Sequence, residues 1–114
     1  MIQGDAPESR RLAALQRYDI LGAPQLNDFD DITRLAAIAC DTPIALITLV
    51  GDTRQWFLSH HGWDEVETER AVSFCALTME QDVMCVPDAR ADERFASNRL
   101  VVGHPGIRFY VGVP

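Results

Sequence analysis

The first part of the chain carries hydrophobic residues at the spacing of an amphipathic helix. Leu12, Leu15 and Tyr18 recur at intervals of three residues, which places them on one helical face. Pro7 suits the opening turn of a helix, and Pro24 is a stop signal beyond its end. The pattern therefore predicts a short first helix followed by a connector.

Residues 27–40 repeat the helical period with a clearer start. Asn27 is a typical N-cap residue, and the acidic side chains that follow it suit the positive end of the helix dipole. The apolar positions form one stripe, made by Ile32, Leu35, Ala36 and Ala39. We expect a second amphipathic helix that ends near Cys40.

Two strands joined by a tight turn follow this helix. Residues 44–50 are a short, β-rich run that is apolar on both faces, which is typical of a central strand covered on both sides. Gly51 and Asp52 mark a turn, and residues 55–60 then alternate between two faces. These features predict a β-hairpin.

The next stretch mixes short elements with loops. Residues 63–70 are crowded with carboxylates and show no period, so we expect a solvated loop there. Ser73 suits the N-cap of a third helix within residues 72–81, and a short strand is expected at residues 83–86. Residues 89–104 are predicted to form an ordered loop around one helical turn.

The last residues alternate with a period of two, which predicts a final strand with one buried face. The alternating sets are Ile107, Phe109, Val111 and Val113 against Arg108, Tyr110 and Gly112. Helices and strands do not alternate strictly along the chain, and the one clear strand pair is antiparallel. The fold class is therefore α+β, or a three-layer α/β arrangement, with an antiparallel sheet.

Composition narrows the classes of function. The 114 residues have the size of a single domain, and 47% hydrophobic with 24% charged residues is ordinary for a soluble globular chain. A net charge of −7 argues against nucleic acid and against an anionic membrane surface as partners. Every basic residue is an arginine, so lysine Schiff-base chemistry and a phosphate-loop lysine are excluded.

The sequence also carries signals about compartment and metals. Its first ten residues lack the apolar core of a secretory signal, and its apolar runs are shorter than a bilayer span, so we expect a cytoplasmic protein. Cys40, Cys75 and Cys85 include no CxxC pair and are predicted to be reduced, buried thiols. His60 and His61 point to opposite faces of a strand, so no metal site is predicted.

Several segments, taken in order, form a combined motif. They are RLAALQRYDIL at residues 11–21, FDDITRLA at 29–36, TPIALITLV at 42–50, RQWF at 54–57, VSFCA at 72–76, VPDA at 86–89 and DERF at 92–95. Together they resemble the GAF domain family, in particular the N-terminal GAF domains found ahead of bacterial histidine kinase or diguanylate cyclase (GGDEF) modules. The resemblance covers nearly the whole chain.

The resemblance implies a fold and a domain plan. The family fold is an antiparallel sheet with helices on both faces (GAF/PAS-like). Residues 1–114 would be a single GAF-like domain, with residues 1–26 as N-terminal helix and connector and residues 27–114 as an incomplete core whose C-terminal strands are missing. One missing strand would pair beside residues 44–50, so the resemblance implies a gap there.

The resemblance also implies a function. Such a domain is non-catalytic, holds a small ligand between its sheet and the helices and loops on one face, and passes a change to an attached output module. A homodimer through the first two helices is expected, whereas the cofactor and the ligand are left unknown. The candidate ligand contacts are Phe74, Cys75, Asp88, Arg94, Phe95, Arg108 and Tyr110.

Each candidate also has a purely structural interpretation. The three aromatic residues are of the type that fills a core, and the aspartate and arginines are of the type that pairs on a surface. Two other functions stay open. Cys75 is the candidate nucleophile of a thiol-based redox enzyme or switch similar to a methionine sulfoxide reductase. Alternatively, the domain is a degenerate scaffold that only dimerises.

Overall fold

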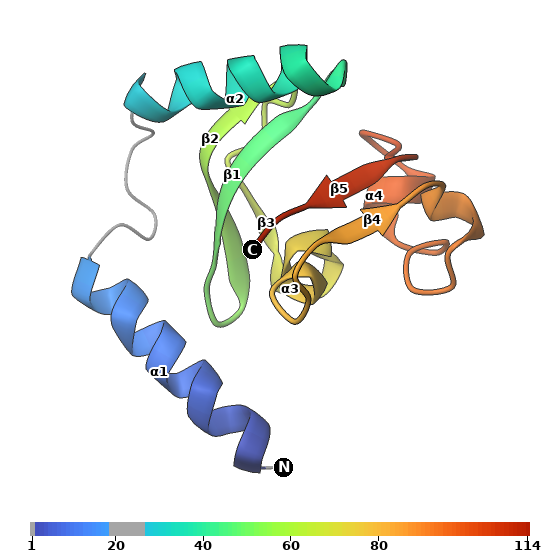
Figure 1. Ribbon diagram of the computed structural model, residues 1–114. Coiled ribbons are helices and arrows are strands. Elements are labelled where there is room, and N and C mark those ends of the chain that lie inside the picture. Colours follow the sequence, from blue (N-terminus) through green and yellow to red (C-terminus); the bar gives the residue numbers. More distant parts are fainter. Residues whose placement is uncertain (1, 19–26) are drawn as a thin grey trace. The chain divides into compact units, whose positions relative to one another are not determined.

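The computed structural model describes residues 2–18 and 27–114 (Figure 1). Their contacts group into two compact units, Met1–Thr68 and Glu69–Pro114. The stop signal predicted at Pro24 lies outside the described residues. The elements are, in chain order, α1 (Ile2–Tyr18), α2 (Asn27–Cys40), β1 (Ala45–Val50), β2 (Arg54–His61), β3 (Glu67–Glu69), α3 (Phe74–Thr78), β4 (Met84–Val86), α4 (Arg99–Val102) and β5 (Tyr110–Gly112), with 3-10 turns at Arg70–Val72 and Ala89–Ala91.

The first unit is built on the predicted hairpin. β1 and β2 pair antiparallel from Ala45 opposite His61 to Val50 opposite Gln55, and the register shifts at Ile47. Gly51 closes the turn where a Cβ would overlap the Trp56 ring, so glycine is required there. Helices combined with antiparallel strand pairs confirm the α+β class.

β1 is not the central strand that its sequence indicates. The sheet order is β1-β2-β3, so β1 pairs with β2 alone within the described residues, and five of its six side chains are only half-buried. The prediction of a central position is wrong for this part of the chain.

The helix α2 lies across the β1–β2 hairpin (Figure 1) and contacts both strands. It turns Thr33 and Ala37 to the sheet, where they are 2% and 5% exposed. The buried Ser59 hydroxyl on β2 donates to Asp30 Oδ1 at 2.6 Å and lies 2.9 Å from Thr33 Oγ1. Polar contacts therefore set the rotation of this helix.

The apolar stripe of α2 faces outward as a consequence of that rotation. Leu35 is 66% exposed, and Ile32, Ala36, Ile38 and Ala39 are exposed as well. An amphipathic helix ordinarily buries such a stripe. Here a carboxylate held by a buried hydroxyl fixes the opposite face on the sheet.

The carboxylate-rich stretch at residues 63–70 is not a solvated loop. It contains β3, in which Thr68 is fully buried and accepts a hydrogen bond from Gln55 Nε2 at 2.9 Å, and Trp63 is 4% exposed against Phe57. The prediction failed because a three-residue strand is too short to show a period. Its acidic residues flank one inward-facing threonine.

The second unit is centred on an apolar core that β4 and β5 line. Its buried members are Phe74, Met84, Val86, Ala89, Phe95 and Val101. The two strands pair antiparallel, with Cys85 opposite Val111. The predicted strand at residues 83–86 is confirmed as β4, whereas the final strand is shorter than predicted, and α4 and the turn at Ala89–Ala91 order the predicted loop.

Ile107 packs against the core as its pattern predicts, but from Phe109 to Val113 the orientation is the reverse of the predicted one. Tyr110 packs against the core, whereas Phe109, Val111 and Val113 are 53%, 49% and 74% exposed. The reason is Gly112, where a Cβ would overlap the Tyr110 hydroxyl, so the tyrosine ring lies over the glycine on the inner face. The apolar residues are left on the outer face of the strand.

Candidate functional site

Aromatic side chains of the second unit form a stack that ends in a guanidinium. The Phe74 and Phe95 rings are parallel, with centroids 3.9 Å apart, and Tyr110 lies tilted against Phe74 at 5.0 Å. The guanidinium of Arg94 lies over the Phe95 ring at 5.1 Å and donates to the Met84 sulfur. We call these four residues, Arg94, Phe95, Phe74 and Tyr110, the aromatic stack.

The inner end of the aromatic stack carries a chain of hydrogen bonds. The Thr78 hydroxyl donates its one hydrogen to the Phe74 carbonyl at 3.1 Å, so Tyr110 must be the donor in its 2.8 Å contact with Thr78. The Cys75 thiol, 3.5 Å from the Tyr110 oxygen, then donates to that oxygen. Each side chain of this hydrogen-bond series therefore has a defined role as donor or acceptor.

This environment favours the neutral phenol. Burial raises the pKa of Tyr110 above its ordinary value, and the neighbouring Cys75 raises it further. Burial is the largest of these effects. Tyr110 therefore stays protonated and serves as a hydrogen-bond donor.

Two aspartate–arginine pairs repeat the same geometry in the loop after β4. Asp88 accepts from the backbone N–H and the guanidinium of Arg90, and Asp92 accepts in the same way from Arg94. Hydrogen bonds from the arginine lower the pKa of each carboxyl, most strongly those from the side chain. Arg90 and Arg94 are thus each directed at the aspartate two residues earlier.

Arg108 is held by the backbone. Its guanidinium donates to the carbonyls of Val101 and Ile107, and its own carbonyl accepts from the Ala89 N–H at 2.6 Å. Asp88, next to Ala89 in the chain, is close enough for the charge of Arg108 to help lower its pKa. The structure therefore brings five candidate residues to the aromatic stack and its hydrogen-bond chain, and leaves Asp88 and Arg108 beside Ala89.

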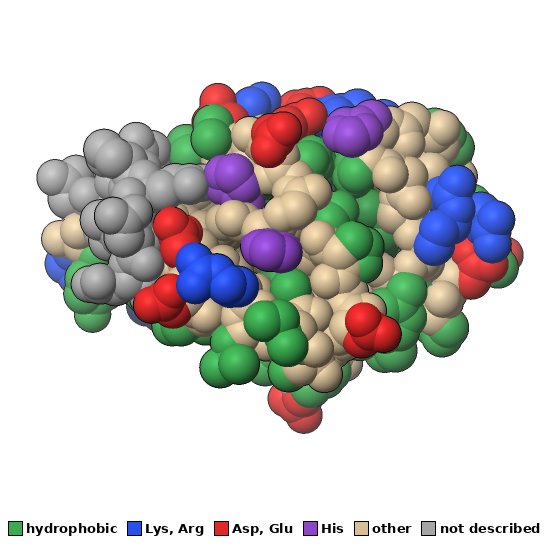
Figure 2. Space-filling view, turned by 90° about the horizontal axis from the view of Figure 1, so that it is seen from above, with side chains coloured by type: hydrophobic (Ala, Val, Ile, Leu, Met, Phe, Trp, Pro, Cys, Tyr) green, Lys and Arg blue, Asp and Glu red, His purple; other side chains and the backbone are tan. Residues whose placement is uncertain are grey.

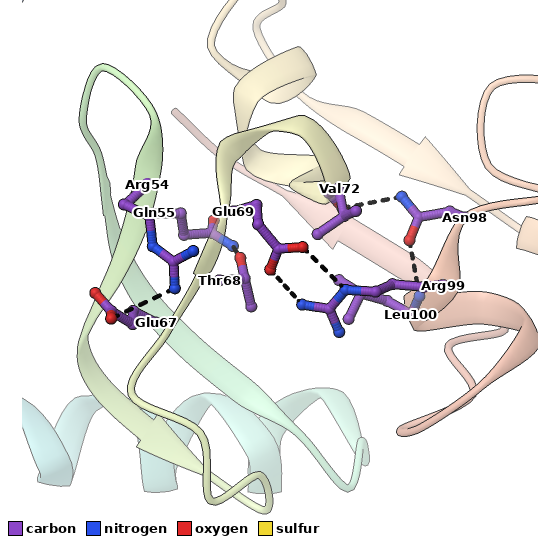
Figure 3. A network of polar contacts seen from close by, with 9 residues as sticks. All are labelled: Arg54, Gln55, Glu67, Thr68, Glu69, Val72, Asn98, Arg99 and Leu100. Carbon is purple, nitrogen blue, oxygen red and sulfur yellow. Dashed lines mark hydrogen bonds and ion pairs between the residues drawn. The ribbon is translucent and has the colours of Figure 1, made fainter.

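Asn98 fixes the loop that carries Arg94 and Phe95. Its side-chain carbonyl accepts from the Leu100 N–H at 2.8 Å and its amide donates to the Val72 carbonyl at 2.9 Å, and Arg99 pairs with Glu69 (Figure 3). The loop is thereby joined to the segment that leads into α3. An asparagine before an apolar run is an N-cap signal, so the sequence offered a sign of this role.

The structure adds two residues to the candidate site that the sequence did not single out, Thr78 and Gly112. Thr78 accepts the Tyr110 hydrogen bond, and Gly112 leaves the space in which the phenol lies. Glycine at a strand position gave a signal, because it marks a close approach of another group. Thr78 gave none, since its role depends on a partner 32 residues away.

The three cysteines lie in different surroundings, and none of them forms a disulfide. Cys40 and Cys85 are exposed, so the prediction that they are buried is wrong: Cys40 ends α2 and Cys85 points to the outer face of β4. Cys75 is half-buried on the inner side, with Tyr110. The β4–β5 sheet therefore separates Cys75 from Cys85.

Charged side chains, metal-ligand residues and helix hydropathy were compared with what other kinds of site require. On the face shown in Figure 2, acidic side chains lie beside the basic ones. Within residues 2–18 and 27–114, no three histidine, cysteine or acidic side chains are grouped as metal ligands would be. No helix of this described part is long and apolar enough to span a membrane.

Comparisons with known proteins bear on the whole of this arrangement. The family profile described as GAF domain matches residues 27–114. A cyclic di-GMP phosphodiesterase of Pseudomonas aeruginosa is 39% identical over 108 residues, which make up 94% of this chain and 18% of that protein. The chain thus spans less than a fifth of the length of the curated relative it matches.

Proposed function

Because the chain belongs to the GAF domain family, we propose that it is a small-molecule-sensing module of a bacterial signal-transduction protein, itself non-catalytic. The observation that carries this proposal is the aromatic stack with its hydrogen-bond chain. The stack has a cation, Arg94, at one end and the hydroxyl groups of Tyr110 and Thr78 at the other, and the phenylalanine rings between them are buried against each other. Ligand sites typically combine a small number of polar groups, directed at one point, with apolar surroundings.

A library of small metabolites tests this proposal by thermal stability. A ligand that binds only the folded state stabilises it by about 2.7 kcal/mol when its free concentration is a hundred times its dissociation constant. The matched variants are Arg94→Gln and Arg90→Gln. Both arginines pair with the aspartate two residues earlier, but Arg94 also lies over the Phe95 ring. Arg94→Gln should weaken ligand binding, and Arg90→Gln should leave it unchanged. Equal effects of the two variants would place the ligand elsewhere.

We propose that the output of the parent protein is turnover of cyclic di-GMP. The similar protein from Pseudomonas aeruginosa is named as a phosphodiesterase of that nucleotide, rather than as the histidine kinase or diguanylate cyclase that the family resemblance first suggested. The proposal is tested in the parent protein, where a ligand of this domain should change the rate of cyclic di-GMP hydrolysis. A rate that does not respond to the bound ligand contradicts it.

We further propose that two copies associate through their first two helices. The exposed Ile32, Leu35 and Ile38 of α2 form an apolar strip of the kind that marks an association surface. Light scattering should give the mass of a dimer for the wild-type chain and of a monomer for Leu35→Gln. A monomeric wild-type chain at high concentration would exclude this interface.

A further inference from the structure

The Tyr110 ring fills a space between α3 and the backbone of β5, which we call the slot. The slot is bounded by the Phe74 ring, by Thr78 and Cys75 on α3, and by the backbone of Gly112. A Cβ on Gly112 would lie 2.7 Å from Tyr110 Cζ and 2.8 Å from Thr78 Oγ1, so it would fill the slot. The absence of that one atom creates the space.

The phenol of Tyr110 is bound there as a ligand would be. One face meets an aromatic ring, its hydroxyl donates to Thr78, and its oxygen accepts from the Cys75 thiol. Thr78 cannot donate to it, because its one hydrogen goes to the Phe74 carbonyl. The slot therefore selects a ring that carries a hydrogen-bond donor.

Tyr110 is the least buried of the three aromatic residues in the stack. It is half-buried and packs against the core of the second unit, whereas Phe74 and Phe95 are 3% and 2% exposed within that core. Its strand, β5, is three residues long and pairs with β4. Phe74 and Phe95 also stack on each other, so their contact does not depend on Tyr110.

We propose that the slot under Tyr110 is a subsite for a small hydroxylated aromatic ligand, and that the Tyr110 ring occupies it when the ligand is absent. The inference rests on the proposed sensing function and adds the class of ligand. Binding turns Tyr110 outward, and the ligand hydroxyl takes over the hydrogen bond to Thr78. The ligand is thereby coupled to the position of β5.

The variant Tyr110→Ala tests the subsite with phenol as the probe. Phenol should bind this variant, measured by calorimetry, and anisole, which has the same ring but no hydroxyl hydrogen, should bind about tenfold more weakly because one hydrogen bond is lost. Wild-type protein should bind phenol at least about tenfold more weakly than the variant, since its own ring competes. The double variant with Gly112→Ala should not bind phenol, because the added Cβ fills the slot.

A second measurement uses the wild-type chain, so the test does not depend on the variant folding. The chain has two tyrosines, and in protein with ¹³C-labelled tyrosine rings, saturating phenol should shift the Tyr110 signal and leave that of Tyr18 in place. Equal affinities of the Tyr110→Ala variant for phenol and anisole, or an unmoved Tyr110 signal, would overturn the subsite. A natural ligand that depends on Arg94 but leaves Tyr110 in place would overturn the subsite alone and leave the sensing function standing.

Discussion

The orientation of α2 gives the sharpest prediction about stability, because the structure and the hydrophobic pattern of the helix point in opposite directions. In Ser59→Ala, the buried hydroxyl that donates to Asp30 at 2.6 Å is lost. A hydrogen bond to a charged group contributes about 1.5–3 kcal/mol. We expect Ser59→Ala to lower the free energy of unfolding by about that amount.

Leu35→Gln is the matched comparison. Leu35 is 66% exposed, so its replacement by a residue of similar helix propensity should change stability by no more than about 0.5 kcal/mol in the monomer. If the stripe of α2 were buried, as its pattern suggests, loss of the leucine would cost about 2–5 kcal/mol. The order of the two variants therefore decides which face of α2 meets the sheet.

Urea unfolding followed by tryptophan fluorescence measures both variants. Both tryptophans of the chain, Trp56 and Trp63, belong to the unit that contains α2, so the signal reports on that unit. With a slope of about 1–3 kcal/mol per molar urea, Ser59→Ala should shift the midpoint by about 1 M. Low protein concentration keeps association through α2 out of the measurement. A larger loss for Leu35→Gln than for Ser59→Ala would refute the orientation.

Three further predictions concern the second unit. The pKa of Tyr110 is higher in the folded state than in the unfolded chain, where tyrosine titrates at about pH 10, so the free energy of unfolding of the wild-type chain should fall as the pH rises above about 10. In urea unfolding, the Tyr110→Phe variant should not show this loss of stability. The Tyr18→Phe variant, changed at a 73% exposed site, should still show it. Arg94→Gln should raise the pKa of Asp92 toward its ordinary value and leave that of Asp88 low, as read by NMR titration, with the reverse result for Arg90→Gln. With a thiol reagent, Cys40 and Cys85 should react before Cys75, because they are exposed; a faster Cys75, whose reaction disappears in Cys75→Ser, would favour a thiol switch over a sensor.

Much of the local structure could be predicted from the sequence, because it depends on neighbours along the chain. The start of α2, the hairpin of β1 and β2, and the Ser73 cap, whose hydroxyl accepts from the Ala76 N–H, all follow from local signals. β3 was missed because its one inward residue, Thr68, is defined by Gln55 on another strand. A strand that is stabilised by residues far away in the sequence need not show a hydrophobic period of its own.

Which face of a helix or strand is buried was harder to predict from the sequence than where the helix or strand lies. Hydrophobic stripes on α2 and β5 both point outward, because Ser59 fixes Asp30 in one case and Gly112 admits the Tyr110 ring in the other. The candidate residues Phe74, Phe95 and Tyr110 do lie together, as contacts between aromatic side chains favour. The direction of the hydrogen-bond chain through Thr78 required the structure.

The central claim is that the aromatic stack binds a small ligand, and the most direct measurement is an ¹⁵N NMR spectrum of the wild-type chain with a stabilising ligand from the metabolite library. The account predicts that the signals that move most belong to α3, to the turn that carries Arg94 and Phe95, and to β5, which together surround the stack. Shifts confined to α2 and the β1–β2 hairpin would contradict it.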